Sequence, residues 1–288
     1  MTFAKSVSTN KKYCFILKLN FTGMKKKVCV FSKIYLLVVI GLIGSIGNSM
    51  ATGSTQIWIP STDIQGFKTV HLGIDNYIRT QQDANGVYGS GIYDMGVTTG
   101  ISPFSKVQAE IGIDYLNMGD NNLSNAKNYD LHPVYFNGKI AIPEDSLFKG
   151  APAIAVGAYN FGTKKGLTDY NIMYALIAKT VPVVGRISVG YYSGNKALLV
   201  DENGVASNTG LLLSWDRAMP EISDKLWLAV DYQGGQNYLG ALNFGFAWNF
   251  SKNVSVIFAY DIYNNHKAFY NSNNVNANSF TTQLDINL

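Results

Sequence analysis

The sequence predicts an all-β protein, a single antiparallel transmembrane β-barrel of about 12 strands in an up-and-down meander. Two observations predict this fold. Segments of about 10 residues alternate apolar and polar side chains, and successive side chains of a strand point to opposite faces. The connections between these segments are alternately short and long. Both features are typical of an outer-membrane barrel, whose closed sheet pairs its backbone groups internally.

The first 51 residues differ from the rest in charge, because they contain eight lysines and no acidic residue. Within this stretch, the apolar run Tyr35 to Gly47 comes after the last lysine, Lys33. It is followed by Ser49-Met50-Ala51, in which the first and last residues are small. This order predicts a signal peptide that is cleaved after Ala51, with Met24 as the expected true start. The alternative is a membrane anchor, but a run of about 13 residues is short for a spanning helix, which needs about 20.

Removing the leader reverses the net charge. The full chain has 23 basic and 19 acidic residues, and without the eight leader lysines the balance is 15 to 19, or −4. The basic excess therefore belongs to the export signal and does not indicate nucleic-acid binding. Cys14 and Cys29 also lie in the leader, so the mature chain has no disulfide and no thiolate metal site.

Residues 52–67 are expected to form a periplasmic lead-in, and the alternative is a segment folded into the barrel mouth. The barrel is expected to span residues 68–288. Its first strand, 68–79, alternates Val70, Leu72 and Ile74 with polar or small residues. The next two strands, 92–101 and 107–117, are joined by a tight turn that contains Pro103.

The middle strands have shorter alternating patterns, and 134–142 and 210–217 are the weakest, so 10 or 14 strands also remain open. The remaining expected strands are 153–162, 170–180, 185–193, 225–233, 240–250, 254–263 and 279–288. The clearest hairpin is 240–263, where Leu242, Phe244 and Phe246 begin one apolar face and Ser251-Lys252-Asn253 forms the turn.

Connections after even-numbered strands are short, and those after odd-numbered strands are mostly longer and rich in Asn, Gly and Asp. With both termini in the periplasm, the long loops face outward from the cell. A soluble β-sandwich is the alternative, but it does not require this alternation. Aromatic residues near strand ends are expected to form two interfacial girdles. They are Tyr77, Tyr115, Tyr191, Tyr192, Tyr232, Tyr260 and Tyr263 at the outer rim, and Trp215, Trp227, Trp248 and Phe250 at the inner rim.

With the apolar face outward, most charged residues of the strands face the lumen. A charge that faces lipid near the bilayer midplane would cost about 2–4 kcal/mol. Small residues such as Ala229, Gly245 and Ala247 share the inward face and predict room for water; a sealed polar core is the alternative. The expected pore-lining charged residues are Asp75, Arg79, Asp94, Glu110, Asp114, Lys139, Lys179, Arg186, Asp216, Asp231, Asp261 and Asp285.

The residue patterns of enzymes and cofactor sites are absent from the sequence. The histidines His71, His132 and His266 do not form a catalytic or zinc-binding pattern, and there is no phosphate-binding glycine loop. We therefore expect neither catalysis nor a cofactor.

The carboxyl-terminal third resembles bacterial outer-membrane β-barrel proteins of the porin-like kind. The residues that carry the resemblance are Trp215-Asp216-Arg217, the segment 241–248, Asn253-Val254-Ser255-Val256 and the final amphipathic strand. The resemblance implies insertion by the barrel-assembly machinery of a Gram-negative bacterium, which in that family reads the last strand. This chain ends in Leu288 where Phe or Trp is more usual.

Together these observations predict an outer-membrane channel for passive diffusion of small hydrophilic solutes or ions. Eight inward acids against four inward bases predict a mild preference for cations. The expected partners are outer-membrane lipid, lipopolysaccharide, the assembly machinery and the solute. The alternative is a sealed barrel with a structural, adhesive or partner-binding role through its extracellular loops.

Overall fold

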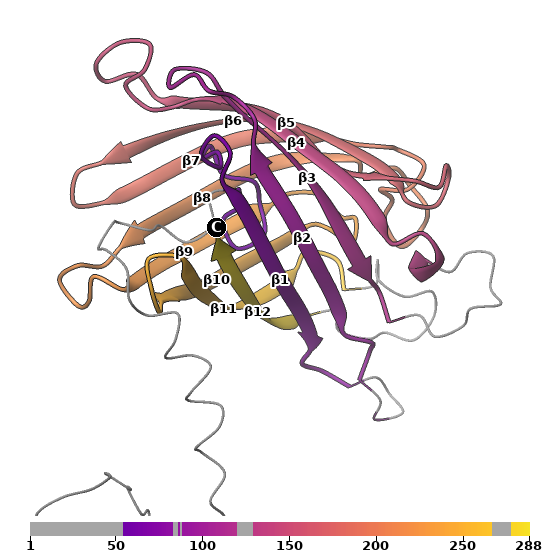
Figure 1. Ribbon diagram of the computed structural model, residues 1–288. Helices are drawn as coiled ribbons and strands as arrows, with labels where there is room; N and C mark the ends of the chain where they lie inside the picture. Colours follow the sequence, from indigo (N-terminus) through magenta and orange to yellow (C-terminus); the bar gives the residue numbers. More distant parts are fainter. Residues whose placement is uncertain (1–53, 83–85, 87, 120–128, 267–277) are drawn as a thin grey trace, which may run out of the picture. The chain divides into compact units, whose positions relative to one another are not determined.

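The computed structural model describes residues 54–82, 86, 88–119, 129–266 and 278–288. They form the 3-10 helix η1 (Tyr129–Leu131) and twelve strands: β1 (Val70–Arg79), β2 (Ile92–Gly100), β3 (Gln108–Asn117), β4 (Val134–Ile142), β5 (Ala153–Gly162), β6 (Asp169–Val181), β7 (Gly185–Ser193), β8 (Thr209–Ala218), β9 (Leu226–Gln233), β10 (Ala241–Asn249), β11 (Val254–Tyr263) and β12 (Ser279–Asn287). Each strand pairs antiparallel with its neighbours in sequence, and β1 pairs with β12 to close the barrel (Figure 1). The predicted fold class, strand number and meander order are confirmed.

The strand limits agree with the predicted limits to within two residues, including those of the two weakest segments. The ladder is irregular between β5 and β6, where the register shifts between Tyr159 and Phe161. Asn160 lies at this shift with a φ of 56°, a left-handed conformation that Asn tolerates better than most residues.

The two ends of the barrel differ in the length of their connections. After even-numbered strands the chain turns within short segments, such as 182–184 between β6 and β7. After odd-numbered strands most connections are longer, such as 194–208 between β7 and β8. We call these two ends the short-turn rim and the long-loop rim.

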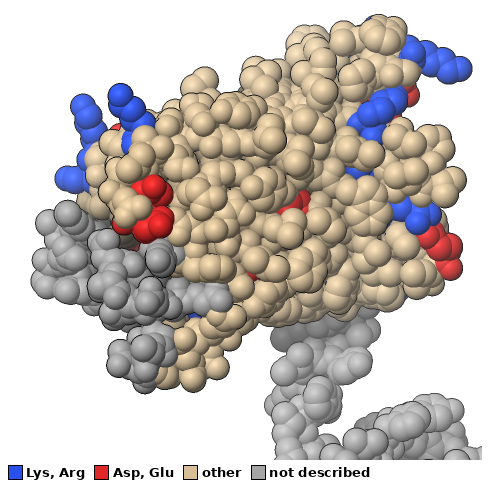
Figure 2. Space-filling view, turned by 180° about the vertical axis from the view of Figure 1, so that it is seen from behind, with Lys and Arg blue, Asp and Glu red and all other residues tan. Residues whose placement is uncertain are grey.

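The outer face of the barrel is apolar. Ile74, Val97, Ile113, Val156 and Leu242 point outward and are between 39% and 57% exposed. Figure 2 shows Lys and Arg side chains toward the two ends of the barrel, with uncharged residues over most of the face between them. This is the surface of a barrel that is solvated by lipid. No helix in the described part of the chain is long and apolar enough to cross a membrane.

The predicted aromatic girdles are only partly present. Tyr115 and Tyr191 lie on the outer face and are 43% and 52% exposed. Tyr192, Tyr263 and Trp227 are buried inside the barrel instead, each at most 3% exposed. Tyr77 also faces the interior, where its ring centroid lies 5.2 Å from that of Trp58. The prediction was wrong for these four residues because aromatic side chains also fill the interior of this barrel, which has its own apolar core.

Residues 54–65 lie inside the barrel, and we call them the inserted segment. Gln56, Ile57 and Ile59 are at most 2% exposed and contact inward side chains of several strands. The expected periplasmic lead-in is therefore wrong, and the alternative of a segment folded into the barrel describes it better. The physical reason is that the segment carries apolar side chains and unpaired backbone groups, which the interior satisfies.

Candidate functional site: the barrel interior

The tip of the inserted segment is a tight turn that is held by one carboxylate. The backbone N–H of Gln56 donates to the carbonyl oxygen of Ile59 at 2.8 Å, and Thr55 and Pro60 form an antiparallel bridge. Asp231 on β9 accepts the backbone N–H groups of Ile57 and Trp58 at 2.8 Å, and that of Ile59 at 3.4 Å. A buried carboxylate thereby satisfies donors that the turn leaves free.

Ile57 packs into a pocket of small side chains. It forms one buried cluster with Ala229, Ala247 and Ala259, and Trp227 and Ile257 complete that cluster. From the sequence alone, the small inward residues predict room for water. At β9, β10 and β11 they provide room for the inserted segment, because larger side chains there would occupy the volume of Ile57.

Ile59 lies against an apolar interior surface. Tyr170, Ile172, Tyr174 and Leu176 of β6 point inward and are buried in the same cluster as Ile59. In β6 apolar residues thus face the lumen, and Met173 and Ile177 on the other side face outward and are 63% and 50% exposed. The strand is apolar on both sides, so its sequence pattern does not identify the inner face.

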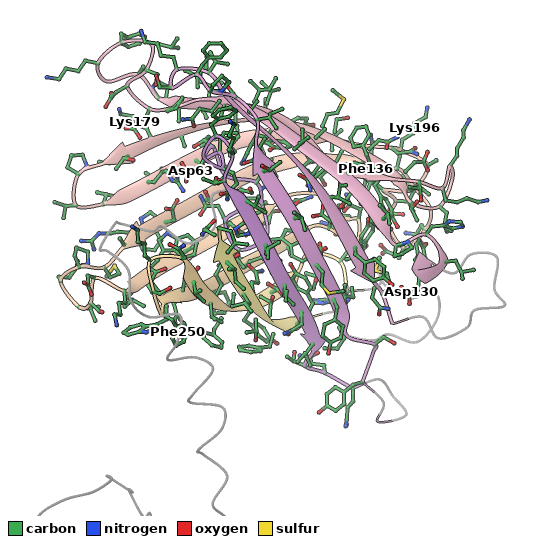
Figure 3. All side chains as sticks on the ribbon, in the orientation of Figure 1. Asp63, Asp130, Phe136, Lys179, Lys196 and Phe250 are labelled. Atoms are coloured by element: carbon green, nitrogen blue, oxygen red, sulfur yellow. The ribbon has the colours of Figure 1, made fainter. Side chains whose placement is uncertain are left out.

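Lys179 consequently lies on the lipid side of β6 and not in the lumen. It shares its side of the sheet with Ile187, its partner in the ladder, and its side chain is 39% exposed. Its ammonium group pairs with Glu144 at 2.6 Å and Asp145 at 3.5 Å in the β4–β5 turn (Figure 3). Lys179 was wrongly placed because the rule that apolar faces point outward fails where the interior packs on Ile59.

Two inward charges of the opposite wall also hold the inserted segment. Lys139 on β4 pairs with Glu110 on β3 at 3.2 Å, and its ammonium also donates to the carbonyl oxygens of Ser54 and Ser61. Glu110 accepts the backbone N–H of Gln65 at 2.7 Å. This ion pair is therefore part of the attachment of the segment.

A second attachment lies near the short-turn rim. Arg186 pairs with Asp63 of the inserted segment at 2.5 Å and with Asp216 on β8 at 2.9 Å. Asp216 also accepts hydrogen bonds from the side chains of Gln56 and Trp227. Figure 3 shows Asp63 within the ring of strands.

Trp58 reaches toward the long-loop rim. Its indole N–H donates to the carbonyl oxygen of Leu239 at 3.0 Å, in the loop between β9 and β10. Its ring lies edge-on to Tyr77 and Tyr263, with centroids 5.2 Å and 5.8 Å away. The segment thus crosses the lumen from Glu110 and Lys139 to Asp231 and the β9–β10 loop.

A cavity of about 240 Å³ remains between the inserted segment and the wall of β1 to β5, and we call it the acid-lined cavity. Asp75, Asp94 and Asp114 line it from adjacent strands, with Asp75 opposite Asp94 in the ladder. None of the three forms an ion pair with a described residue. Asp114 accepts a hydrogen bond from Asn137 at 2.6 Å. Trp58, Tyr77, Tyr159, Tyr174 and Tyr238 contribute aromatic surface to the same cavity.

The remaining expected residues, Arg79, Asp261 and Asp285, also lie in the interior. Asp285 also lines the cavity, but it pairs with His71 at 3.4 Å. Near the long-loop rim, Asp261 accepts a hydrogen bond from Ser279 at 2.7 Å, and Arg79 lies over the ring of Tyr263. The inward charges therefore divide into those that hold the inserted segment, those paired with each other or with polar neighbours, and the three acids of the cavity.

Sequence reasoning missed the residues of the inserted segment, above all Gln56, Trp58 and Asp63. Their only signal was a cluster of apolar residues ahead of the first strand, without the alternation of a strand. Among the described residues, no group of three or more His, Cys, Asp or Glu side chains is arranged to hold a metal ion.

No protein-family model matches the chain, and no curated protein matches it. Solved structures that resemble it include the NanC porin, with a TM-score of 0.43 and 10% identity over 75% of this chain and 98% of that one. An outer membrane channel from Pseudomonas putida F1 has a TM-score of 0.43 and 8% identity, over 83% of this chain and 98% of that one. Salmonella typhi OmpF has a TM-score of 0.39 and 8% identity, over 77% and 97%. Likeness at this level carries no functional argument, and the assignment of a closed transmembrane barrel rests on the strand pairing and the apolar outer face.

Proposed function

We propose that the protein is a narrow outer-membrane channel that passes small hydrophilic cations by passive diffusion. The conducting path is the acid-lined cavity, which the inserted segment confines to one side of the lumen. In this proposal the barrel reaches the outer membrane after export by the signal peptide and insertion by the barrel-assembly machinery, and it contacts lipid and lipopolysaccharide.

The observation that carries the proposal is the imbalance of charge along the cavity. Asp75, Asp94 and Asp114 face it without a basic partner, whereas the basic residue that also lines it, Lys139, is paired with Glu110. Acidic side chains that line a narrow passage favour cations by their local potential. The cavity extends from Ser54 and His71 to Met118 and Tyr238, so it follows the barrel from the region of the short-turn rim toward the long-loop rim.

The test is the reversal potential of the purified protein in planar bilayers under a salt gradient. We expect conductance steps with a weak cation preference that fades near 1 M salt, where the Debye length is about 3 Å. Replacing Asp75, Asp94 and Asp114 together by Asn should shift the reversal potential toward anions. Asp224→Asn, which removes one exposed acid from the β8–β9 turn, is the matched control and should not shift it.

Two results would overturn this function. A folded wild-type barrel without conductance steps would favour the sealed barrel, since the inserted segment already fills one side of the lumen. An unchanged reversal potential in the triple variant, with conductance retained, would show that the ions do not pass these acids.

A further inference from the structure

We propose that the acid-lined cavity is a binding site for a small organic cation, an ammonium group on an aromatic or apolar body. This inference rests on the proposed function, because it names the class of solute that the channel admits. Three features of the cavity support it: unbalanced acids, an aromatic wall and a small volume.

The three acids lie next to one another on three adjacent strands. Asp75 and Asp94 are direct partners in the β1–β2 ladder, and Asp114 is the partner of Gly96 in the β2–β3 ladder. Asp94 is half-buried, and its buried Oδ1 accepts no hydrogen bond from the described residues. Like charges in one enclosed space repel each other, and a bound cation with several N–H donors would relieve this repulsion.

Aromatic rings face the same space. Trp58 comes from the inserted segment, Tyr238 from the β9–β10 loop, and Tyr159 and Tyr174 from β5 and β6. Ring faces attract cations and also provide apolar contact area. A hydrated inorganic ion would use only the acids, whereas an organic cation would use both the acids and the rings.

The space is small, and two of the side chains that line it pack against glycines. A Cβ atom on Gly96 would lie 2.8 Å from Oδ1 of Asp114, and one on Gly157 would lie 2.5 Å from the hydroxyl oxygen of Tyr174. The volume of about 240 Å³ is below the range of about 300–1,000 Å³ typical of drug-sized ligands, which favours a small molecule.

The experiment is calorimetric titration of the folded full-length protein in detergent at low salt. The probe is 2-phenylethylamine, and its neutral and anionic counterparts are 2-phenylethanol and phenylacetate. We expect binding of the amine alone. Asp94→Asn, which preserves side-chain shape, should weaken binding by about tenfold or more, since a hydrogen bond to a charged group contributes about 1.5–3 kcal/mol. Asp224→Asn should bind like the wild type.

Each outcome decides the proposal. Equal binding of the alcohol or of phenylacetate would overturn it, as would unchanged amine affinity in both Asp94→Asn and Asp114→Asn with the barrel folded. Conductance without amine binding would overturn the binding site and leave the channel in place. Amine binding by a barrel without conductance would support the site and overturn the channel.

Discussion

Lys139 and Glu110 lie opposite each other on β4 and β3, and both side chains are only 3% exposed. Removing one partner of a buried ion pair leaves an uncompensated charge and typically costs about 3–5 kcal/mol. We therefore expect Lys139→Met to destabilise the barrel by that amount, measured by urea unfolding in lipid vesicles. Lys139 also donates to two carbonyl oxygens of the inserted segment, which adds to the loss.

The matched control is Lys196→Met, which removes an exposed lysine of the β7–β8 loop (Figure 3). It should change the free energy of unfolding by less than about 0.5 kcal/mol. The double variant Glu110→Gln with Lys139→Met should recover part of the stability, because no unpaired charge remains. Equal stability of wild type and Lys139→Met would contradict the role given to this pair.

For single residues, the sequence predicted most of the inward charges, because a charged side chain that faces lipid has an unfavourable free energy. The alternation of side chains along a strand, with charged residues on the inner face, placed Asp231 and Glu110 on the inner side, where the structure has them. It could not show what these residues bind, because that depends on Ile57, Trp58 and Gln65, which are distant in sequence. It failed for Lys179, whose neighbours Ile177 and Ile187 face lipid while its ammonium reaches Glu144 at the rim.

Among the elements, the inserted segment has the largest effect on the lumen. We expect deletion of residues 55–65 to leave the strand ladder closed, since none of these residues belongs to it. The deletion opens the side of the lumen toward β8 to β12, so single-channel conductance in planar bilayers should rise severalfold. A folded deletion variant with unchanged conductance would show that the segment does not limit the path.

The β4–β5 turn predicts a dependence on pH. Burial alone would raise the pKa of Glu144, but hydrogen bonds from Lys179 and Thr180 outweigh it and hold the pKa below its ordinary value of 4.5. A carboxyl whose pKa is lower in the folded state stabilises the fold above pH 4.5, and this contribution disappears as the pH falls through the lowered pKa. Glu144→Gln should therefore unfold with a smaller change between pH 6 and pH 3 than the wild type, measured by urea midpoints. Parallel profiles would contradict this.

The elements differed in how well their sequence predicted them. Strands such as 254–263 have an apolar residue at every second position, because their outer face contacts lipid, and their limits were predicted to within two residues. The inserted segment has no period, because its contacts with Asp231, Glu110 and Arg186 follow the shape of a completed lumen. Only the closed barrel determines that shape.

For the whole molecule, closure by β1 and β12 leaves no free strand edge. Such a ladder resists dodecyl sulfate at room temperature, since every strand would have to separate from two neighbours. We expect the unheated protein to migrate faster in gel electrophoresis than the boiled protein. Identical migration, with the protein in the soluble fraction, would contradict a transmembrane barrel.

The inserted segment also has a mechanical consequence. Its two arms lie side by side, with the backbone N–H of Ser61 donating to the carbonyl oxygen of Ser54, and the second arm runs on into β1. Residues 54–61 thus form a folded-back hairpin inside the ring of strands. Withdrawal of the inserted segment would unpair no strand, but it would break the bonds to residues such as Asp231 and Arg186 and the packing of Ile57 and Ile59. Force applied to the chain at Ser54 would act on this hairpin before it acted on β1. The hairpin would therefore leave the lumen before any strand separated from its neighbours.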